Sequence, residues 1–182
     1  MPHYRVGFCL ALSACSALAF CDNVKTWDQI SQIGGPAFWG LGLGSSLVQD
    51  GRLGGEHAAR TLDGFLVAGA SSELIEHFTR EKRPYSDKVD SFPSTHAALS
   101  FEIAASQSYF HPSQAPLWYG GAAVISYARV AGHRHHWWDV LAGAALGYAA
   151  GQLSASSRHG WITAPLVHPQ ERPAFMLGGV RF

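Results

Sequence analysis

Apolar and small residues gather along the chain in five stretches, separated by Gly, Pro and charged residues. The stretches cover residues 36–48, 61–82, 95–109, 117–128 and 137–154. All five are longer than typical strands, and in the second, residues 61–82, apolar or small residues recur at helical spacing, so the pattern predicts helices. The sequence therefore predicts an all-α fold, a helical bundle of about five or six helices.

Residues near the ends of these stretches suit the ends of helices. Ser94 and Thr95 can cap the third helix, because their side-chain oxygens can accept from free backbone N–H groups. Pro36 and Pro116 suit the first turns of the first and fourth helices, where a missing N–H costs nothing. Residues 161–167 and 174–182 are short and apolar-rich, and they predict a short C-terminal β-hairpin after the bundle.

Composition narrows the class of protein. The 182 residues are 47% hydrophobic, and 13 basic groups balance 13 acidic ones. A chain of zero net charge lacks the electrostatic attraction that drives most binding to nucleic acid, so we expect no nucleic-acid partner.

Residues 29–49, 103–128 and 140–157 are uncharged for the length of a membrane span. Their Gly, Ser and Gln content, with a mean hydropathy of +0.02, favours buried core helices over spans.

The N-terminal segment predicts export. Residues 1–5 are basic, residues 6–20 are mostly apolar, and Ala17-Leu18-Ala19 fits a cleavage site. Fifteen residues at 1.5 Å each span only about 22 Å, which is short for a membrane anchor. We expect a signal peptide at 1–19, a single domain at 20–182, and a location in the bacterial periplasm, with association with the membrane as an open alternative.

The cysteines agree with this division. Cys9, Cys15 and Cys21 all lie in or just after the apolar segment, so cleavage leaves one cysteine and no internal disulfide. Residues 18–21 also resemble a bacterial lipoprotein box, although Phe20 stands where such a box has a small residue. Lipidation of Cys21 is thus an alternative to simple cleavage.

Unusual polar residues are concentrated in three segments near the ends of the predicted helices: residues 80–84, 93–96 and 129–139. Ser94 and Thr95 begin a helix, whose free N–H groups and dipole attract anions. Arg83 and Arg129 add planar guanidinium groups that match phosphate oxygens. The segments predict an anion site that binds phosphate.

The same segments carry groups for nucleophilic catalysis. His135 and Asp139 are four residues apart, so on a helix they share a face, where the carboxylate can hold one imidazole nitrogen and leave the other free to attack. His96, which opens another helix, is then available to protonate a leaving oxygen.

In this order and spacing the segments resemble the three-part signature of the type 2 phosphatidic acid phosphatase family. This family belongs to the superfamily of bacterial class A acid phosphatases and vanadium haloperoxidases. The resemblance rests on Arg83-Pro84, on Pro93-Ser94-Thr95-His96, and on Arg129 with His135 and Asp139 at the family's spacings.

The resemblance implies a metal-independent hydrolase without a cofactor, acting on a phosphomonoester or pyrophosphate through a phosphohistidine. It implies that His135 is the nucleophile, that Asp139 orients it, and that His96 is the acid and later the base. Arg83, Ser94 and Arg129 would hold the phosphoryl oxygens, with Thr95 beside them in the second motif. Most members of the family act on lipids, so the expected partner is a phosphorylated lipid or a small phosphate ester.

Three positions depart from the signature. Thr95 replaces a Gly and Ala128 replaces a Ser, whereas Glu76 stands where the family has a phosphate-binding Lys. On a continuous helix Glu76, Arg80 and Arg83 would share one face. We therefore predict that Arg80 replaces the missing Lys as a phosphate ligand and that Glu76 pairs with it.

Alternatives remain open at this stage. The site could belong to a broad-specificity soluble acid phosphatase, to a haloperoxidase, although those are much longer chains, or to a descendant that binds phosphate without turnover. A metal site at His133, His135 and His136 is not expected, because adjacent histidines on a helix point about 100° apart. Trp137 and Trp138 could contact a membrane surface, although buried core is the commoner role for such residues.

Overall fold

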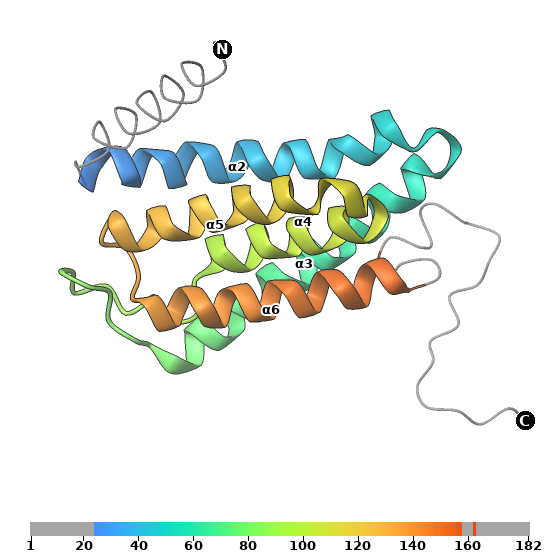
Figure 1. The fold of residues 1–182 in the computed structure, drawn as a ribbon. Helices are drawn as coiled ribbons and strands as arrows, with labels where there is room; N and C mark the ends of the chain where they lie inside the picture. The colour runs from blue at the N-terminus through green and yellow to red at the C-terminus, as the bar shows by residue number, and fades with distance from the viewer. Residues whose placement is uncertain (1–23, 158–161, 163–182) are drawn as a thin grey trace, which may run out of the picture.

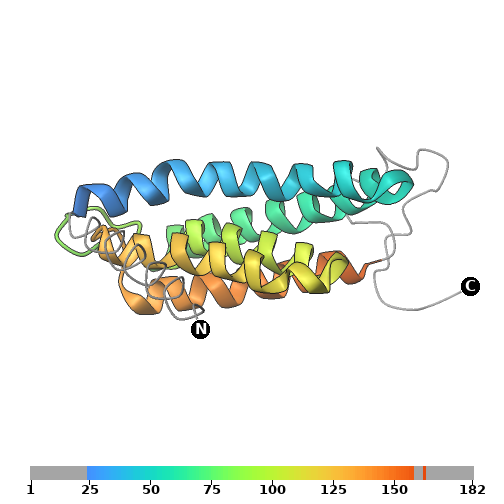
Figure 2. The ribbon, with the colours of Figure 1, turned by 45° about the horizontal axis from the view of Figure 1, so that its top comes forward.

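The computed structural model describes residues 24–157 and residue 162. In these residues the chain forms α2 (Val24–Gln49), α3 (Gly54–Thr79), α4 (Thr95–Phe110), α5 (Ala115–Ala131) and α6 (Trp137–Ser156), with short 3-10 turns η1 (Gly51–Leu53) and η2 (Pro112–Gln114). The helices lie side by side as a bundle, as Figures 1 and 2 show. The all-α prediction is confirmed. The predicted hairpin lies outside the described residues except for Ile162.

The three C-terminal helices follow the sequence pattern closely. Helices α4 and α6 begin at the predicted residues, Thr95 and Trp137, and Pro116 stands in the first turn of α5. Ser94 is the N-cap residue of α4, yet its side chain makes no capping hydrogen bond. Its hydroxyl is therefore available for another partner.

The predicted start of the first helix is wrong, because α2 begins at Val24 and Pro36 lies inside it. Tertiary contacts support the additional turns. Asp28 accepts two hydrogen bonds from the Arg134 guanidinium, at 2.7 and 2.6 Å, and Ser31 is fully buried. These contacts join the start of α2 to the segment after α5.

The predicted bounds of the second helix, 61–82, are also wrong at both ends. Helix α3 begins at Gly54, where a Cβ would come within 2.6 Å of the Ser46 carbonyl oxygen of α2. It ends at Thr79, because Arg80 takes the left-handed conformation (φ 49°, ψ 40°) that terminates a helix. The close approach at Gly54 and the turn at Arg80 are not visible in the hydrophobic pattern.

Helix α4 lies at the centre of the bundle and contacts α2, α3, α5 and α6. Ile103 and Ala104 are fully buried in its middle. Helix α6 crosses close to α4, because Gly143 and Gly147 face the backbone carbonyls of Ser94 and Ala98, where a Cβ would overlap those atoms. This contact fixes the first turn of α6 beside the first turn of α4.

One end of the bundle collects the loops that carry the signature. The α3–α4 loop (80–94), the α5–α6 loop (132–136) and the start of α2 lie together at the left of both views (Figures 1 and 2). Between residues 24 and 157, no helix is long and apolar enough to cross a membrane.

Candidate active site

The fold brings most of the sequence-predicted site residues to this loop end. Arg83 lies in the α3–α4 loop, Ser94, Thr95 and His96 begin α4, Arg129 ends α5, His135 lies in the α5–α6 loop, and Asp139 stands in the first turn of α6. Three segments distant in sequence thus form one group around His135.

The His135 imidazole is held at both nitrogens. Its Nδ1 lies 2.8 Å from the Ser91 carbonyl oxygen, and its Nε2 lies 3.1 Å from Nη2 of Arg129. A carbonyl only accepts and a guanidinium only donates, so Nδ1 carries the proton and Nε2 presents its lone pair. Burial, with the charge of Arg129 second, lowers the pKa of His135 to about 3. His135 is therefore a neutral imidazole near pH 7, as a nitrogen nucleophile requires.

The structure brings the Asp139 carboxylate close to His135, but without a direct hydrogen bond. His135 precedes α6 instead of sharing its face, and its Nδ1 lies 3.8 Å from Oδ2 of Asp139, beyond hydrogen-bond distance. Oδ2 instead accepts from the Ser91 hydroxyl at 2.5 Å and from the His136 backbone N–H at 2.7 Å. Asp139 thus organises the two loops that flank the nucleophile.

Arg129 is buried with only 2% of its surface exposed, and it fixes one wall of the site. Its Nη1 donates to the Ser31 hydroxyl of α2 at 3.3 Å, whereas its Nε has no hydrogen-bond partner in the described structure. Burial, with the nearby charge of Arg83 second, lowers its pKa to about 10, so it stays a cation at neutral pH. A buried cationic N–H without a partner is an unfilled position for an anion.

Two hydroxyls at the start of α4 are also buried without a hydrogen-bond partner. The side-chain oxygens of Ser94 and Thr95 are buried, and within the described residues neither has a hydrogen-bond partner. Ser94 is held in place through its backbone N–H, which donates to the Asp139 carbonyl at 3.0 Å. These oxygens lie at the helix N-terminus, where the dipole favours negative charge.

His96 is half-buried in the first turn of α4, with its ring centroid 5.2 Å from that of Trp39. Burial, followed by the positive charges of Arg129 and Arg83, lowers its pKa to about 4. A bound phosphoryl group would neutralise these charges and favour the protonated form. The side chain is therefore suited to donate a proton once substrate is present.

Arg83 is held by Asp90 of the same loop. Its Nη2 donates to Oδ2 of Asp90 at 2.9 Å, and its backbone N–H donates to the Lys88 carbonyl at 2.9 Å. Its charge also lowers the pKa values of His96, His135 and Arg129.

The structure does not place Glu76, Arg80 and Arg83 on one helical face, because α3 ends before Arg80. Arg80 is exposed, and its backbone N–H donates to the Glu76 carbonyl at 3.1 Å. Burial raises the pKa of Glu76 to about 6, and Arg83, not Arg80, is the cation that acts on it. The geometric basis for Arg80 as a substitute ligand is therefore wrong, although its role as a ligand stays a prediction.

Sequence reasoning missed Ser91, Ser31 and Asp28. Ser91 is fully buried and contacts both His135 and Asp139, whereas Ser31 and Asp28 position Arg129 and Arg134 from α2. None of the three belongs to a motif. Only the contact between segments distant in sequence shows them.

A cleft of about 380 Å³ adjoins the site through Arg83. Its lining includes Lys25, Lys88 and Arg134 together with Asp28, so it is predominantly basic. Tyr85 lines the cleft as well, and its ring lies 4.8 Å from that of His133.

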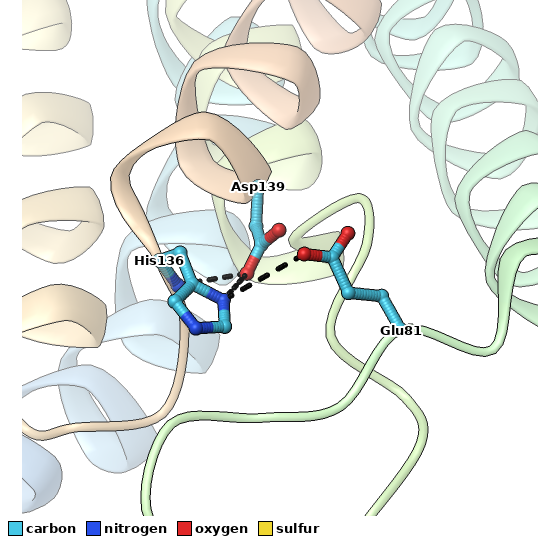
Figure 3. A group of neighbouring side chains, drawn as sticks. All are labelled: Glu81, His136 and Asp139. Atoms are coloured by element: carbon cyan, nitrogen blue, oxygen red, sulfur yellow. Dashed lines mark hydrogen bonds and ion pairs between the residues drawn. The ribbon is translucent and has the colours of Figure 1, made fainter.

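Among the residues that the structure describes, one group of side chains could hold a metal ion. Glu81, His136 and Asp139 offer ligand atoms that lie within 4.8 Å of one another (Figure 3). Only one of its members is a histidine, so it is not the cluster of His133, His135 and His136 considered from the sequence. Asp139 already accepts hydrogen bonds here from Ser91 and from the His136 backbone.

Comparison with known proteins agrees with this geometry. The sequence matches the PAP2 superfamily over residues 65–162, which includes α4, α5, α6 and every residue of the resembled signature. The chain therefore belongs to the PAP2 superfamily, and the suspected family is confirmed. Members of this superfamily are phosphatases, which supports a hydrolase acting on phosphate esters. No curated protein and no solved structure matches the chain.

Proposed function

We propose that this protein is a metal-independent phosphatase that hydrolyses a phosphomonoester or pyrophosphate of a lipid through a phosphohistidine at His135. The observation that carries the proposal is the neutral His135, whose Nε2 faces Arg129 beside three buried donors without partners. Those donors are Nε of Arg129 and the hydroxyls of Ser94 and Thr95. A phosphoryl group with its three oxygens supplies the acceptors that such donors require.

In the first step Nε2 of His135 attacks phosphorus, and the bond from phosphorus to the leaving oxygen breaks. His96 gives its proton to that oxygen, while Nδ1–H of His135 stays bonded to the Ser91 carbonyl. In the second step His96 takes a proton from water, the water oxygen attacks phosphorus, and the P–N bond breaks. Arg129, Arg83 and Ser94 stabilise the charge on the equatorial oxygens in both steps.

A lipid phosphate is the favoured substrate class, and two surface features support it. The basic cleft beside Arg83 suits an anionic headgroup. Trp137 and Trp138 follow the nucleophile and are 53% and 55% exposed, as expected for aromatic rings at a membrane interface.

We further propose that the protein acts after export to the periplasm and contacts the membrane at its surface. The proposal depends on residues 1–19, which lie outside the described part of the chain. Intact-mass measurement of the native protein tests it, because a mass that retains residues 1–19 would contradict cleavage. Extraction by detergent only, and never by carbonate or high salt, would contradict peripheral attachment.

A phosphate-binding descendant without turnover is the second candidate, and Glu76 favours it. This carboxyl stands where the family has a cation, and Arg83 must offset its charge as well as that of Asp90. Such a protein would bind phosphate or vanadate and release none from an ester.

One assay separates these possibilities. Release of inorganic phosphate is measured in EDTA from phosphatidic acid, phosphatidylglycerol phosphate, undecaprenyl pyrophosphate and p-nitrophenyl phosphate, with His135→Ala as the matched control. Turnover of a lipid with vanadate inhibition is expected. Preference for p-nitrophenyl phosphate would favour a soluble acid phosphatase, and binding without turnover would favour the descendant.

A further inference from the structure

We propose that Ser91 is a positioning residue through which Asp139 controls the orientation of the nucleophile His135. This inference rests on the proposed function and deepens it. Ser91 belongs to none of the three signature segments. It lies in the α3–α4 loop, before the Pro93–His96 segment, and it is fully buried.

Ser91 connects the Asp139 carboxylate to the His135 imidazole through two hydrogen bonds. Its hydroxyl donates to Oδ2 of Asp139 at 2.5 Å, and its carbonyl oxygen lies 2.8 Å from Nδ1 of His135. The direct distance between Asp139 and His135 is 3.8 Å, which is too long for a hydrogen bond. The shortest hydrogen-bonded route from the carboxylate to the imidazole therefore passes through Ser91.

The loop around Ser91 is braced from the side of α6. The Ser91 backbone N–H donates to the Glu81 carbonyl at 3.0 Å, and Oε1 of Glu81 accepts from the Trp138 indole at 2.8 Å. The Trp138 ring stacks on His136 at 4.4 Å, and Nδ1 of His136 lies 3.2 Å from Oδ2 of Asp139. Figure 3 shows Glu81, His136 and Asp139 facing one another. These contacts hold the Asp139 carboxylate in place and restrict the position of the Ser91 backbone.

The hydrogen bonds of Ser91 determine which nitrogen of the His135 imidazole carries the proton. A fixed carbonyl at Nδ1 holds the proton there, so Nε2 keeps its lone pair, which faces Arg129 in this structure. Loss of the Ser91 hydroxyl frees the loop and lets the imidazole exchange its proton or turn. Substrate contacts through Arg129 and Ser94 are unaffected, so loss of the Ser91 hydroxyl should slow the chemical step and leave substrate binding unchanged.

The test compares Ser91→Ala with Ser91→Thr, which keeps a hydroxyl. Ser91→Ala is expected to lower kcat by about 10- to 100-fold, the effect of removing an outer partner of a site residue, with KM nearly unchanged. Ser91→Thr is expected to recover most of kcat. Ser106→Ala is the matched control, because it also removes a buried bond from serine to a carboxylate, at 2.7 Å to Glu102, away from His135. It should change the melting temperature and leave kcat unchanged.

A double-mutant cycle separates a route through Ser91 from a direct action of Asp139. We expect Asp139→Asn to slow turnover strongly in wild type and only slightly in Ser91→Ala, because both changes break one chain of contacts. Equal slowing in both backgrounds would overturn the inference.

The tautomer gives a readout that does not depend on turnover. In ¹⁵N-histidine spectra, wild-type His135 is expected to show a protonated Nδ1 and an unprotonated Nε2, whereas Ser91→Ala should gain the Nε2-protonated form. An unchanged His135 signal in a folded Ser91→Ala protein would contradict the proposal. If no substrate is turned over but the tautomer shifts, the proposed function fails and the positioning role stands.

Discussion

The buried polar groups at the start of helix α4 and the Gln107 side chain near its end differ in their hydrogen bonding. At its start, the Ser94 and Thr95 hydroxyls and Nε of Arg129 have no partner among the described residues. Toward its end, Nε2 of Gln107 donates to the Gly42 carbonyl at 2.9 Å and to the Ser46 hydroxyl at 3.2 Å, and Oε1 of Gln107 accepts from Ser45 at 2.8 Å. An unpaired buried donor costs about 1–3 kcal/mol, whereas a paired one stabilises the core. Unpaired buried donors are therefore typical of a binding site, whereas the paired Gln107 side chain is typical of a structural contact.

Glu102 lies between these two ends and belongs to neither. It is fully buried, accepts from Ser106 through Oε1, and leaves Oε2 without a partner in the described core. Burial raises the pKa of this carboxyl well above its usual value. Burial thus favours the neutral form of this carboxyl in the middle of α4, and we expect it to affect stability and not the reaction.

The largest expected effect tests whether the loop end is catalytic at all. His135→Ala should abolish turnover, because no other group supplies the attacking nitrogen. Phosphate release is the measurement, with binding of vanadate as a check that the site still forms. Wild-type activity in His135→Ala would remove the basis for a phosphohistidine.

The unpartnered donors predict the next effect. Arg129→Lys keeps one positive charge but loses Nε and the fork, so kcat/KM should fall about 100- to 1,000-fold, as when a transition-state donor is removed. Gln107→Glu, at the other end of α4, should lower the melting temperature and leave kcat nearly unchanged. A small effect of Arg129→Lys on kcat/KM would show that the missing partners do not mark the phosphate site.

The lowered pKa of His96 predicts a dependence on pH. His96 must carry a proton to act as the acid, and its pKa in the empty site is about 4, so kcat/KM should rise as pH falls from 7 toward 5. His96→Ala should lower kcat by about 100- to 10,000-fold and flatten that limb of the profile. Activity that increases above pH 7 in wild type would contradict the assignment.

Glu102 predicts an effect on stability alone. Its folded pKa is raised above the usual 4.5, so its contribution is complete below that pH and is lost as pH rises through the folded value. Glu102→Gln should therefore stabilise the protein more at pH 8 than at pH 4 and leave kcat/KM within about threefold. Denaturant unfolding at both pH values measures this. Equal changes at the two values would show that Glu102 is ionised in the fold.

The smallest expected effect concerns Arg80. Glycine favours the left-handed conformation that Arg80 adopts, so Arg80→Gly should raise the free energy of unfolding by about 0.5–1 kcal/mol. Because the side chain is exposed, kcat/KM should change by less than about threefold. Lys82→Ala, an exposed cation of the same loop, is the control. A loss of ten- to a hundredfold in Arg80→Gly alone would restore Arg80 as a phosphate ligand.

The sequence by itself determined the all-α class, the first residues of two helices and the family. The stretches of apolar and small residues located α4 and α6 at their first residues, because stretches of that length suit helices better than strands. The spacing of Arg129, His135 and Asp139 identified the family, because the order of reactive groups is a property of the chain alone.

Only the tertiary structure decided how these groups meet. The close packing of Gly143 and Gly147 on α4 joins two helix starts, and Asp139 then reaches Ser91 from across 48 positions of sequence. The left-handed turn at Arg80 ends α3 and removes the helical face that the sequence predicted. Contacts of this kind depend on the distance between segments in space, which a pattern along one segment does not contain.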